Sequence, residues 1–335
     1  MAEISVKAAI RDHFPSANLA QGVFGSTLHA AYQGHRDSFP YTSLRDWLHS
    51  LEWPPASAYH YLGDYPEDRA PGWTDNVQGV ATSGTHWVFS AESEGLWKIP
   101  LTHDLDKNVD DGQLLHAAVP APFSGVDRPH MGDLDHFEGL LFVPFEGVDP
   151  KRIMLFRVSD LAFLGTGNVA EQSDCPWCAV NPRNRLLYSS HFNTDHLNVY
   201  RLSLLTNTTG AVTGLELKFL YNFELRNGAG ARLLVSRVQG GAFSPSGHLY
   251  LVSDAADGGL MGFDMTTGRL MFQRTKASLP TDVEMEGITI FDADAASTPH
   301  IGGQIHIVWL QDEAVVDDDI YFSHFRIAAE HRHKV

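Results

Sequence analysis

The chain has 335 residues, 43% of them hydrophobic and 11% aromatic, which is enough to bury the core of one large domain or two ordinary ones. Its formal net charge of −17 argues against binding to nucleic acid or to an anionic membrane, because both require clustered Lys and Arg. Cationic ligands or metal ions are more compatible partners. Cys175 and Cys178 cannot form a disulfide framework, and we predict that both are buried free thiols.

Residues 1–52 contain two amphipathic patterns, which predict two short helices joined by a loop. The patterns are formed by Ile4, Ala8, Ile10 and Phe14, and by Leu44, Trp47, Leu48 and Leu51. We expect this extension to cover the rest of the chain as a cap, with a lid over a site as the alternative. The first residues lack an apolar signal segment, and no stretch is long and apolar enough to span a bilayer, so we expect a cytoplasmic protein.

A repeated pattern organises the remainder of the chain. The most complete copy is 238–254, in which Gln239-Gly240 opens an apolar strand, Pro245-Ser246-Gly247 supplies a turn, and a second strand ends at Asp254. The Gln or Glu position of the five copies is occupied by Gln78, Met131, Pro176, Gln239 and Glu286. Recurrence at such intervals is typical of a radial repeat fold.

Each copy accommodates the four strands of one blade. The predicted blades are 78–118, 131–170, 176–225, 239–275, and 286–328 completed by 57–65. The last copy shows only three strands of its own, whereas 57–65 resembles an outer strand without a blade, so pairing the two closes the ring and removes both sheet edges. The sequence therefore predicts an all-β, five-bladed β-propeller over residues 53–335. A six-bladed ring, with its extra blade in 1–56, is the alternative.

Polar residues recur at two equivalent positions in the blades. In an antiparallel four-stranded blade, the loop entering the first strand and the loop between the second and third strands lie at the same end. The entry position and the residue two before it face the axis, and they are Asn76/Gln78, Pro129/Met131, Asp174/Pro176, Arg237/Gln239 and Glu284/Glu286. The second strands end at Glu92, Glu146, His191, Asp254 and Gln311. We therefore predict one polar funnel at this end of the axis.

Carboxylates and side-chain amides around one funnel suit Ca²⁺, which takes six to eight oxygen ligands. A bound cation would also relieve repulsion between the acids. The predicted metal ligands are Glu286, Gln239, Gln78, Asp174, Glu284 and Asn76. The alternative is a water-filled channel in which these side chains hydrogen-bond to neighbouring inner strands and to Arg237.

Histidines at the same funnel are candidate acid–base groups. We predict that His130 and His191 move a proton on a substrate held over the axis, with Asp254 and Glu92 completing the candidate catalytic set. Trp177 either packs between blades or offers a stacking surface to a sugar. The predicted substrate contacts are Arg237, Glu146, Trp177 and Gln311.

The segments Met285-Glu286-Gly287-Ile288 and Gln239-Gly240-Gly241-Ala242 resemble those of β-propeller hydrolases that hold calcium on the axis. These are the calcium-activated nucleotidases and the lactonase, paraoxonase and gluconolactonase group. The resemblance covers about 57–328, and Met131 and Pro176 depart from it at two axial positions. It implies a metal-dependent hydrolase acting on a small-molecule ester, lactone or phosphoanhydride. A propeller that binds a glycan or protein without catalysis, and a biosynthetic lyase or cyclase using the same funnel, are the alternatives.

Overall fold

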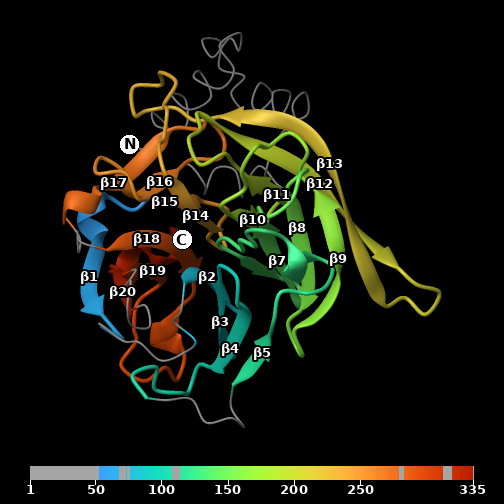
Figure 1. The fold of residues 1–335 in the computed structure, drawn as a ribbon. Helices are drawn as coiled ribbons and strands as arrows, with labels where there is room; N and C mark the ends of the chain where they lie inside the picture. The colour runs from blue at the N-terminus through green and yellow to red at the C-terminus, as the bar shows by residue number, and fades with distance from the viewer. Residues whose placement is uncertain are drawn as a thin grey trace.

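The computed structural model describes residues 53–67, 73, 76–107, 114–278, 283–311 and 319–334. The strands in these ranges form five four-stranded antiparallel sheets, arranged as a ring around a central axis (Figure 1). The prediction of an all-β, five-bladed propeller is confirmed. The predicted helical extension, and with it nearly all of the segment considered for a sixth blade, lies outside the described residues.

The strands of each blade are consecutive in sequence, apart from the strand that closes the ring. The first blade contains β2 (Val77–Thr82), β3 (His86–Ala91), β4 (Gly95–Pro100) and β5 (Leu115–Ala117). The second contains β6 (Asp135–Phe137), β7 (Leu140–Phe145), β8 (Arg152–Arg157) and β9 (Ala162–Asn168). The third contains β10 (Cys178–Val180), β11 (Leu186–Ser189), β12 (His196–Thr206) and β13 (Val212–Glu224).

The fourth blade contains β14 (Val238–Phe243), β15 (Leu249–Ser253), β16 (Gly259–Phe263) and β17 (Leu270–Arg274). The fifth contains β18 (Glu284–Ile290), β19 (Ile305–Gln311), β20 (Asp319–Ile327) and β1 (Tyr59–Asp64). Short 3₁₀ helices occur at η1 (Ala56–Ala58), η2 (Phe123–Gly125), η3 (Lys276–Ser278), η4 (Ala293–Ala295) and η5 (Ala329–Lys334). None of the helices within the described ranges has the length and apolar character needed to cross a membrane.

Ring closure follows the predicted route. β1 pairs antiparallel with β20, with Tyr59 opposite Ile327, so the first described strand completes the last blade (Figure 1). Tyr59 also reaches the fourth blade, since its ring stacks on Phe272 at a centroid distance of 3.9 Å and its hydroxyl is 2.9 Å from that of Tyr250. The closing strand is therefore held both by backbone pairing within its own blade and by side-chain packing on the neighbouring one.

Apolar side chains fill the space between neighbouring blades. Strand residues alternate between the two faces of a sheet, and each of these faces packs against another blade, so both sets of side chains are apolar. The fully buried Trp87, Trp177 and Trp309 lie in three different inter-blade clusters. The two cysteines are buried free thiols, as predicted.

Asp133 joins the blades at the axis. Its carboxylate accepts the backbone N–H groups of Val80, Gly241 and Ile288 at 3.1, 3.0 and 3.2 Å, and these residues belong to the first, fourth and fifth blades. The backbone N–H of Asp133 donates to the carbonyl of Pro176, at the entry to the third blade, at 2.8 Å. One residue of the second blade thus contacts each of the other four.

Glycines make room for this carboxylate. A Cβ atom at Gly79 would lie 2.5 Å from the Cα of Asp133, and one at Gly240 or Gly287 would lie 2.6 Å from an oxygen of its carboxylate. Real Cβ atoms essentially never approach other heavy atoms so closely. The Gly that follows the Gln or Glu position in these three repeats is therefore a packing requirement at the axis.

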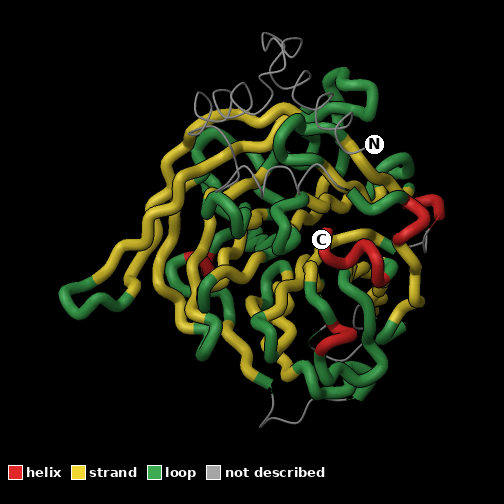
Figure 2. The backbone as a smooth tube through the Cα atoms, turned by 180° about the vertical axis from the view of Figure 1, so that it is seen from behind, coloured by secondary structure: helices red, strands yellow, loops and turns green. Residues whose placement is uncertain are grey.

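The hairpin of β12 and β13 is longer than any other part of its blade. It extends beyond the sheet and runs along the outer strand β9 of the second blade (Figures 1 and 2). A Cβ at Gly165 in β9 would lie 3.0 Å from the Cα of Gly214 in β13, so the two strands meet backbone to backbone. The outer ends of the second and third blades are therefore in direct contact.

Candidate functional site: the axial pocket

One end of the axis contains a pocket of about 460 Å³. All five blades contribute to it, because the entry loops and the loops after the second strands meet at this end. Its lining includes the predicted site residues Asn76, Gln78, Glu92, His130, Glu146, Asp174, Gln239, Glu284 and Glu286. Pro176, Phe192 and Leu310 complete the wall. The structure therefore brings most of the entry positions, and two of the five second-strand ends, Glu92 and Glu146, to one cavity.

Glu92 and His130 are paired in the pocket wall, with 3.4 Å between Oε1 of Glu92 and Nδ1 of His130. Burial acts to lower the pKa of His130, but the hydrogen bond to Glu92 and the charges of Glu92, Glu146 and Glu284 outweigh it, so the pKa is raised. The hydrogen bond from His130 lowers the pKa of Glu92. The backbone holds the two residues together, since the N–H of Met131 donates to the carbonyl of Glu92 at 3.0 Å.

Glu286 is the buried acid of the pocket. Burial raises its pKa well above the usual value, and the negative charges of Glu284, Asp254 and Asp133 raise it further. The side-chain amide of Gln239 donates to Glu284 at 3.0 Å and reaches Oε1 of Glu286 at 3.5 Å. A raised pKa favours the protonated form of the carboxyl group, which is able to donate a hydrogen bond as well as accept one.

The remaining acids of the pocket accept hydrogen bonds from the backbone. Glu146 accepts the N–H of Cys175, and Asp174 accepts the N–H of Phe192 at 2.6 Å. His191 lies beside Asp174, with 3.5 Å between Nδ1 and the nearer carboxylate oxygen, but it is outside the pocket lining. These contacts fix both carboxylates in the entry region of the third blade.

Two further predicted residues lie outside the lining and serve the fold. Asp254 is nearly buried, forms ion pairs with Lys276 and with Arg237 at 2.5 Å, and accepts the N–H of Met285 at 2.9 Å. Arg237 also pairs with Glu284 at 2.8 Å. Asp254 therefore takes part in an ion-pair network that joins the fourth and fifth blades, and its catalytic role stays a prediction.

Trp177 and Gln311 do not line the pocket either. Trp177 is fully buried, and its indole N–H donates to the hydroxyl of Ser190 at 2.8 Å, so of the two predicted alternatives the structure shows packing between blades. A ring without exposed surface offers no face on which a sugar could stack. Gln311, at the end of β19, accepts a hydrogen bond from Tyr321 at 3.2 Å.

The donor set does not fit a preformed calcium site. Within the described residues, no group of three or more His, Cys, Asp and Glu side chains is arranged to hold a metal ion. Glu284 is paired with Arg237, Asp174 with the backbone, and Glu286 has a pKa raised by burial, which disfavours the anion that Ca²⁺ binds. The geometry instead favours the predicted alternative of a hydrogen-bonded, polar pocket.

The opposite end of the axis holds a smaller cavity of about 220 Å³, lined in part by Asp135. The carboxylate of Asp135 accepts the N–H groups of Val180 at 2.7 Å and His136 at 2.8 Å. Burial raises the pKa of this carboxyl to about 7. Sequence reasoning missed both Asp135 and Asp133. A signal existed for the second, because Asp133 is the one carboxylic acid in a column otherwise occupied by Val80, Cys178, Gly241 and Ile288.

No family model and no curated relative matches this chain. Among solved structures, the PQQ-bound aldose sugar dehydrogenase of Streptomyces coelicolor is 10% identical, with 82% of this chain and 100% of that chain covered and a TM-score of 0.43. A gluconolactonase of Xanthomonas campestris is 11% identical, with 82% and 99% covered and a TM-score of 0.42. The similarity is too distant to transfer either activity. By its own geometry, the chain is a five-bladed β-propeller with a polar axial pocket.

Proposed function

We propose that the axial pocket is the active site of a hydrolase for small-molecule esters or lactones, with His130 as the acid–base group. The observation that carries this proposal is the Glu92–His130 pair in the wall of a cavity of about 460 Å³, a size common for small-molecule sites. The carboxylates of the same wall disfavour phosphate-type substrates, which would bring more negative charge into it. Neutral or cationic acyl compounds are the better match.

Each step of the reaction uses residues of the pocket. Neutral His130 takes a proton from water through Nε2 while Glu92 orients the ring through Nδ1, and the water oxygen attacks the acyl carbon. The carboxyl of Glu286 in its protonated form, which its raised pKa favours, and the side-chain amide of Gln78 are the candidate hydrogen-bond donors to the carbonyl oxygen as it gains negative charge. His130 then returns the proton to the leaving oxygen, which gives an acid and an alcohol. Repulsion from the wall favours release of the ionised acid.

The test is hydrolysis of nitrophenyl acetate and of the lactone dihydrocoumarin by the wild type and by His130→Gln. We expect the substitution to lower kcat/KM on the better substrate by about 100-fold, as is usual when an acid–base group is lost. The matched control is His116→Gln, because His116 is an exposed histidine on β5 that stacks on Trp97 away from the axis. Hydrolysis that is absent in the wild type, or equal in the wild type and His130→Gln, would reject the proposal.

The pH profile gives an independent check. The base form of His130 is available only above its raised pKa, so kcat/KM is expected to rise with pH through that value. Glu92→Gln removes the carboxylate whose hydrogen bond contributes most to raising the pKa of His130. The ascending limb of the profile is therefore expected to move to lower pH, while maximal activity falls. A limb that stays in place would show that a different group titrates.

A further inference from the structure

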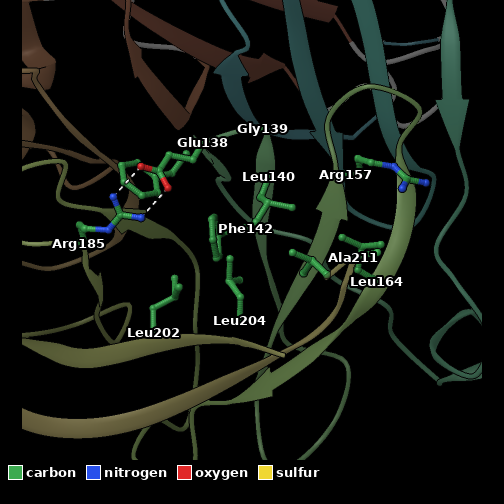
Figure 3. Close-up of a pocket in the computed structure, with 12 residues that line it drawn as sticks. Glu138, Gly139, Leu140, Phe142, Arg157, Leu164, Arg185, Leu202, Leu204 and Ala211 are labelled. Atoms are coloured by element: carbon green, nitrogen blue, oxygen red, sulfur yellow. Dashed lines mark hydrogen bonds and ion pairs between the residues drawn. The ribbon is translucent and has the colours of Figure 1, made fainter. Parts of the chain in front are cut away.

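A second cavity, of about 510 Å³, lies away from the axis, between the second and third blades (Figure 3). Its wall combines the β6–β7 turn, strands β7 to β9 and the long β12–β13 hairpin. Leu140, Phe142, Leu164, Leu202 and Leu204 supply apolar side chains to it. None of these residues belongs to the axial pocket.

The cavity is an uncovered part of an inter-blade core. Leu140 and Phe142 are buried members of the apolar cluster between the second and third blades, and Leu164 and Leu202 pack against it while keeping some exposure. Leu204, on the projecting part of β12, is 37% exposed. A bound apolar group would therefore extend an existing core and remove this surface from water.

The charged groups at the cavity are already compensated within the chain. Arg185 makes a bidentate pair with Glu138, with N–O distances of 2.6 and 2.5 Å, and Arg157 makes one with Asp160 at 2.8 Å for both bonds (the Arg185–Glu138 pair is drawn in Figure 3). The Arg185 guanidinium also lies 5.2 Å from the ring centroid of Phe137. A charged ligand head would have to compete with one of these pairs, whereas an uncharged polar head would leave both intact.

From the apolar wall and the paired charges, we propose that this cavity binds a neutral amphipathic small molecule, with its apolar body against Leu140, Phe142 and Leu204 and its uncharged polar group at the Glu138–Arg185 pair. The volume lies within the range of about 300 to 1,000 Å³ that is usual for small-molecule sites. The negative charge of the whole chain further disfavours an anionic ligand.

Two fluorescent naphthalene probes of similar size test the proposal, since Prodan is neutral and anilinonaphthalene sulfonate is an anion. We expect Prodan to bind the full chain at one saturable site with a blue-shifted emission, and to bind about tenfold more tightly than the sulfonate. Tighter binding of the sulfonate would overturn the assignment of a neutral ligand. Absence of saturable Prodan binding would overturn the site itself.

The chain offers a matched pair of variants on adjacent exposed leucines. Successive strand residues face opposite sides, and Leu204 lines the cavity whereas Leu205, which is 49% exposed, does not. Leu204→Gln is expected to weaken Prodan binding about tenfold through lost apolar contact, and Leu205→Gln to leave it within about twofold. Equal effects of the two substitutions would mean that the probe adheres to exposed apolar surface, and the proposal would fail.

Discussion

At the scale of single residues, Asp133 has contacts that no other side chain of the repeat reproduces. Its two carboxylate oxygens receive N–H donors from three blades, and no solvent reaches them. Burial raises the pKa of this carboxyl, although the three N–H donors act in the opposite direction. The same three donors would be left unsatisfied in the core if the side chain were lost.

Asp133→Asn is therefore expected to destabilise the fold although it preserves the shape of the side chain. The new NH₂ group points a donor at backbone donors, and leaving buried polar groups unpaired costs about 1 to 3 kcal/mol each. We expect the free energy of unfolding in urea to fall by about 3 kcal/mol in total. Asp257→Asn, at an exposed loop position, is the control. A loss no greater than that of the control would mean that Asp133 does not hold the blades together.

The raised pKa of the buried Asp135 carboxyl leads us to predict that the stability of the fold depends on pH. Its pKa of about 7 lies above the value near 3.9 of an unfolded Asp, so the native state binds this proton more tightly. The free energy of unfolding is therefore expected to fall as pH rises from about 4 to about 7, and this one group contributes at most about 1.4 kcal/mol per pH unit. Urea unfolding at several pH values measures the slope, and Asp135→Asn is expected to reduce it, while Asp133 and Glu286, whose pKa values are also raised, keep their contributions.

The control for this effect is Asp160→Asn. The hydrogen bonds from Arg157 lower the pKa of Asp160 to about 2, below the window in which Asp135 titrates. This variant is expected to keep the wild-type slope. If both variants changed the slope equally, the change would result from the loss of any negative charge and not from the loss of the buried carboxyl.

At the scale of elements, β1 determines whether the ring is closed. Its register with β20 buries Tyr59, and burial raises the pKa of the Tyr59 hydroxyl. The residue before β1 is Ala58, the last residue of η1, and its carbonyl accepts the N–H of Ala328, just after β20, at 2.9 Å. The closing contact is thus assembled from a few residues of one short segment.

Two substitutions of Tyr59 distinguish the contribution of its hydroxyl from that of its ring. Tyr59→Phe removes only the hydroxyl that pairs with Tyr250, so we expect a loss of about 1 kcal/mol. Tyr59→Ala also removes the ring that stacks on Phe272, so we expect a loss of about 4 kcal/mol. Denaturant unfolding of both variants gives the comparison. Equal losses would place the closing energy in the hydrogen bond, and negligible losses would show that backbone pairing alone closes the ring.

At the scale of the whole molecule, closure and the axial contacts predict cooperative unfolding. Each blade is packed on two neighbours, so the loss of one exposes the cores of both. Trp87, Trp177 and Trp309 report on the first, third and fifth blades. Tryptophan fluorescence and far-ultraviolet circular dichroism are expected to give the same thermal midpoint, as for a two-state transition. Separate midpoints would show that blades unfold independently.

The features that could be predicted from the sequence are those that depend on positions repeated in all five blades. The blades, the closing strand and the end of the axis where polar residues gather all follow from positions that recur, because the same physical constraint acts on every copy. Contacts that a single residue makes in one blade could not be predicted in this way. Asp254 occupies a recurring polar column, yet Lys276 and Arg237 reach it from outside that column, which removes it from the pocket. Trp177 shows the same limit, since its position in the repeat gives no information on whether the ring is buried.

Because Asp133 occupies the space that a Cβ would need at Gly79, Gly240 and Gly287, those four positions are not free to vary independently. A larger residue at one of these glycines would also meet backbone atoms, which are the Cα of Asp133 for Gly79, the carbonyl oxygen of Glu286 for Gly240 and the Cα of Gly79 for Gly287. A smaller side chain at position 133 would therefore not make room for it. In descendants of this sequence, we therefore expect glycine to be retained at positions 79, 240 and 287, three sites that lie in three different blades and are separated by up to about two hundred residues.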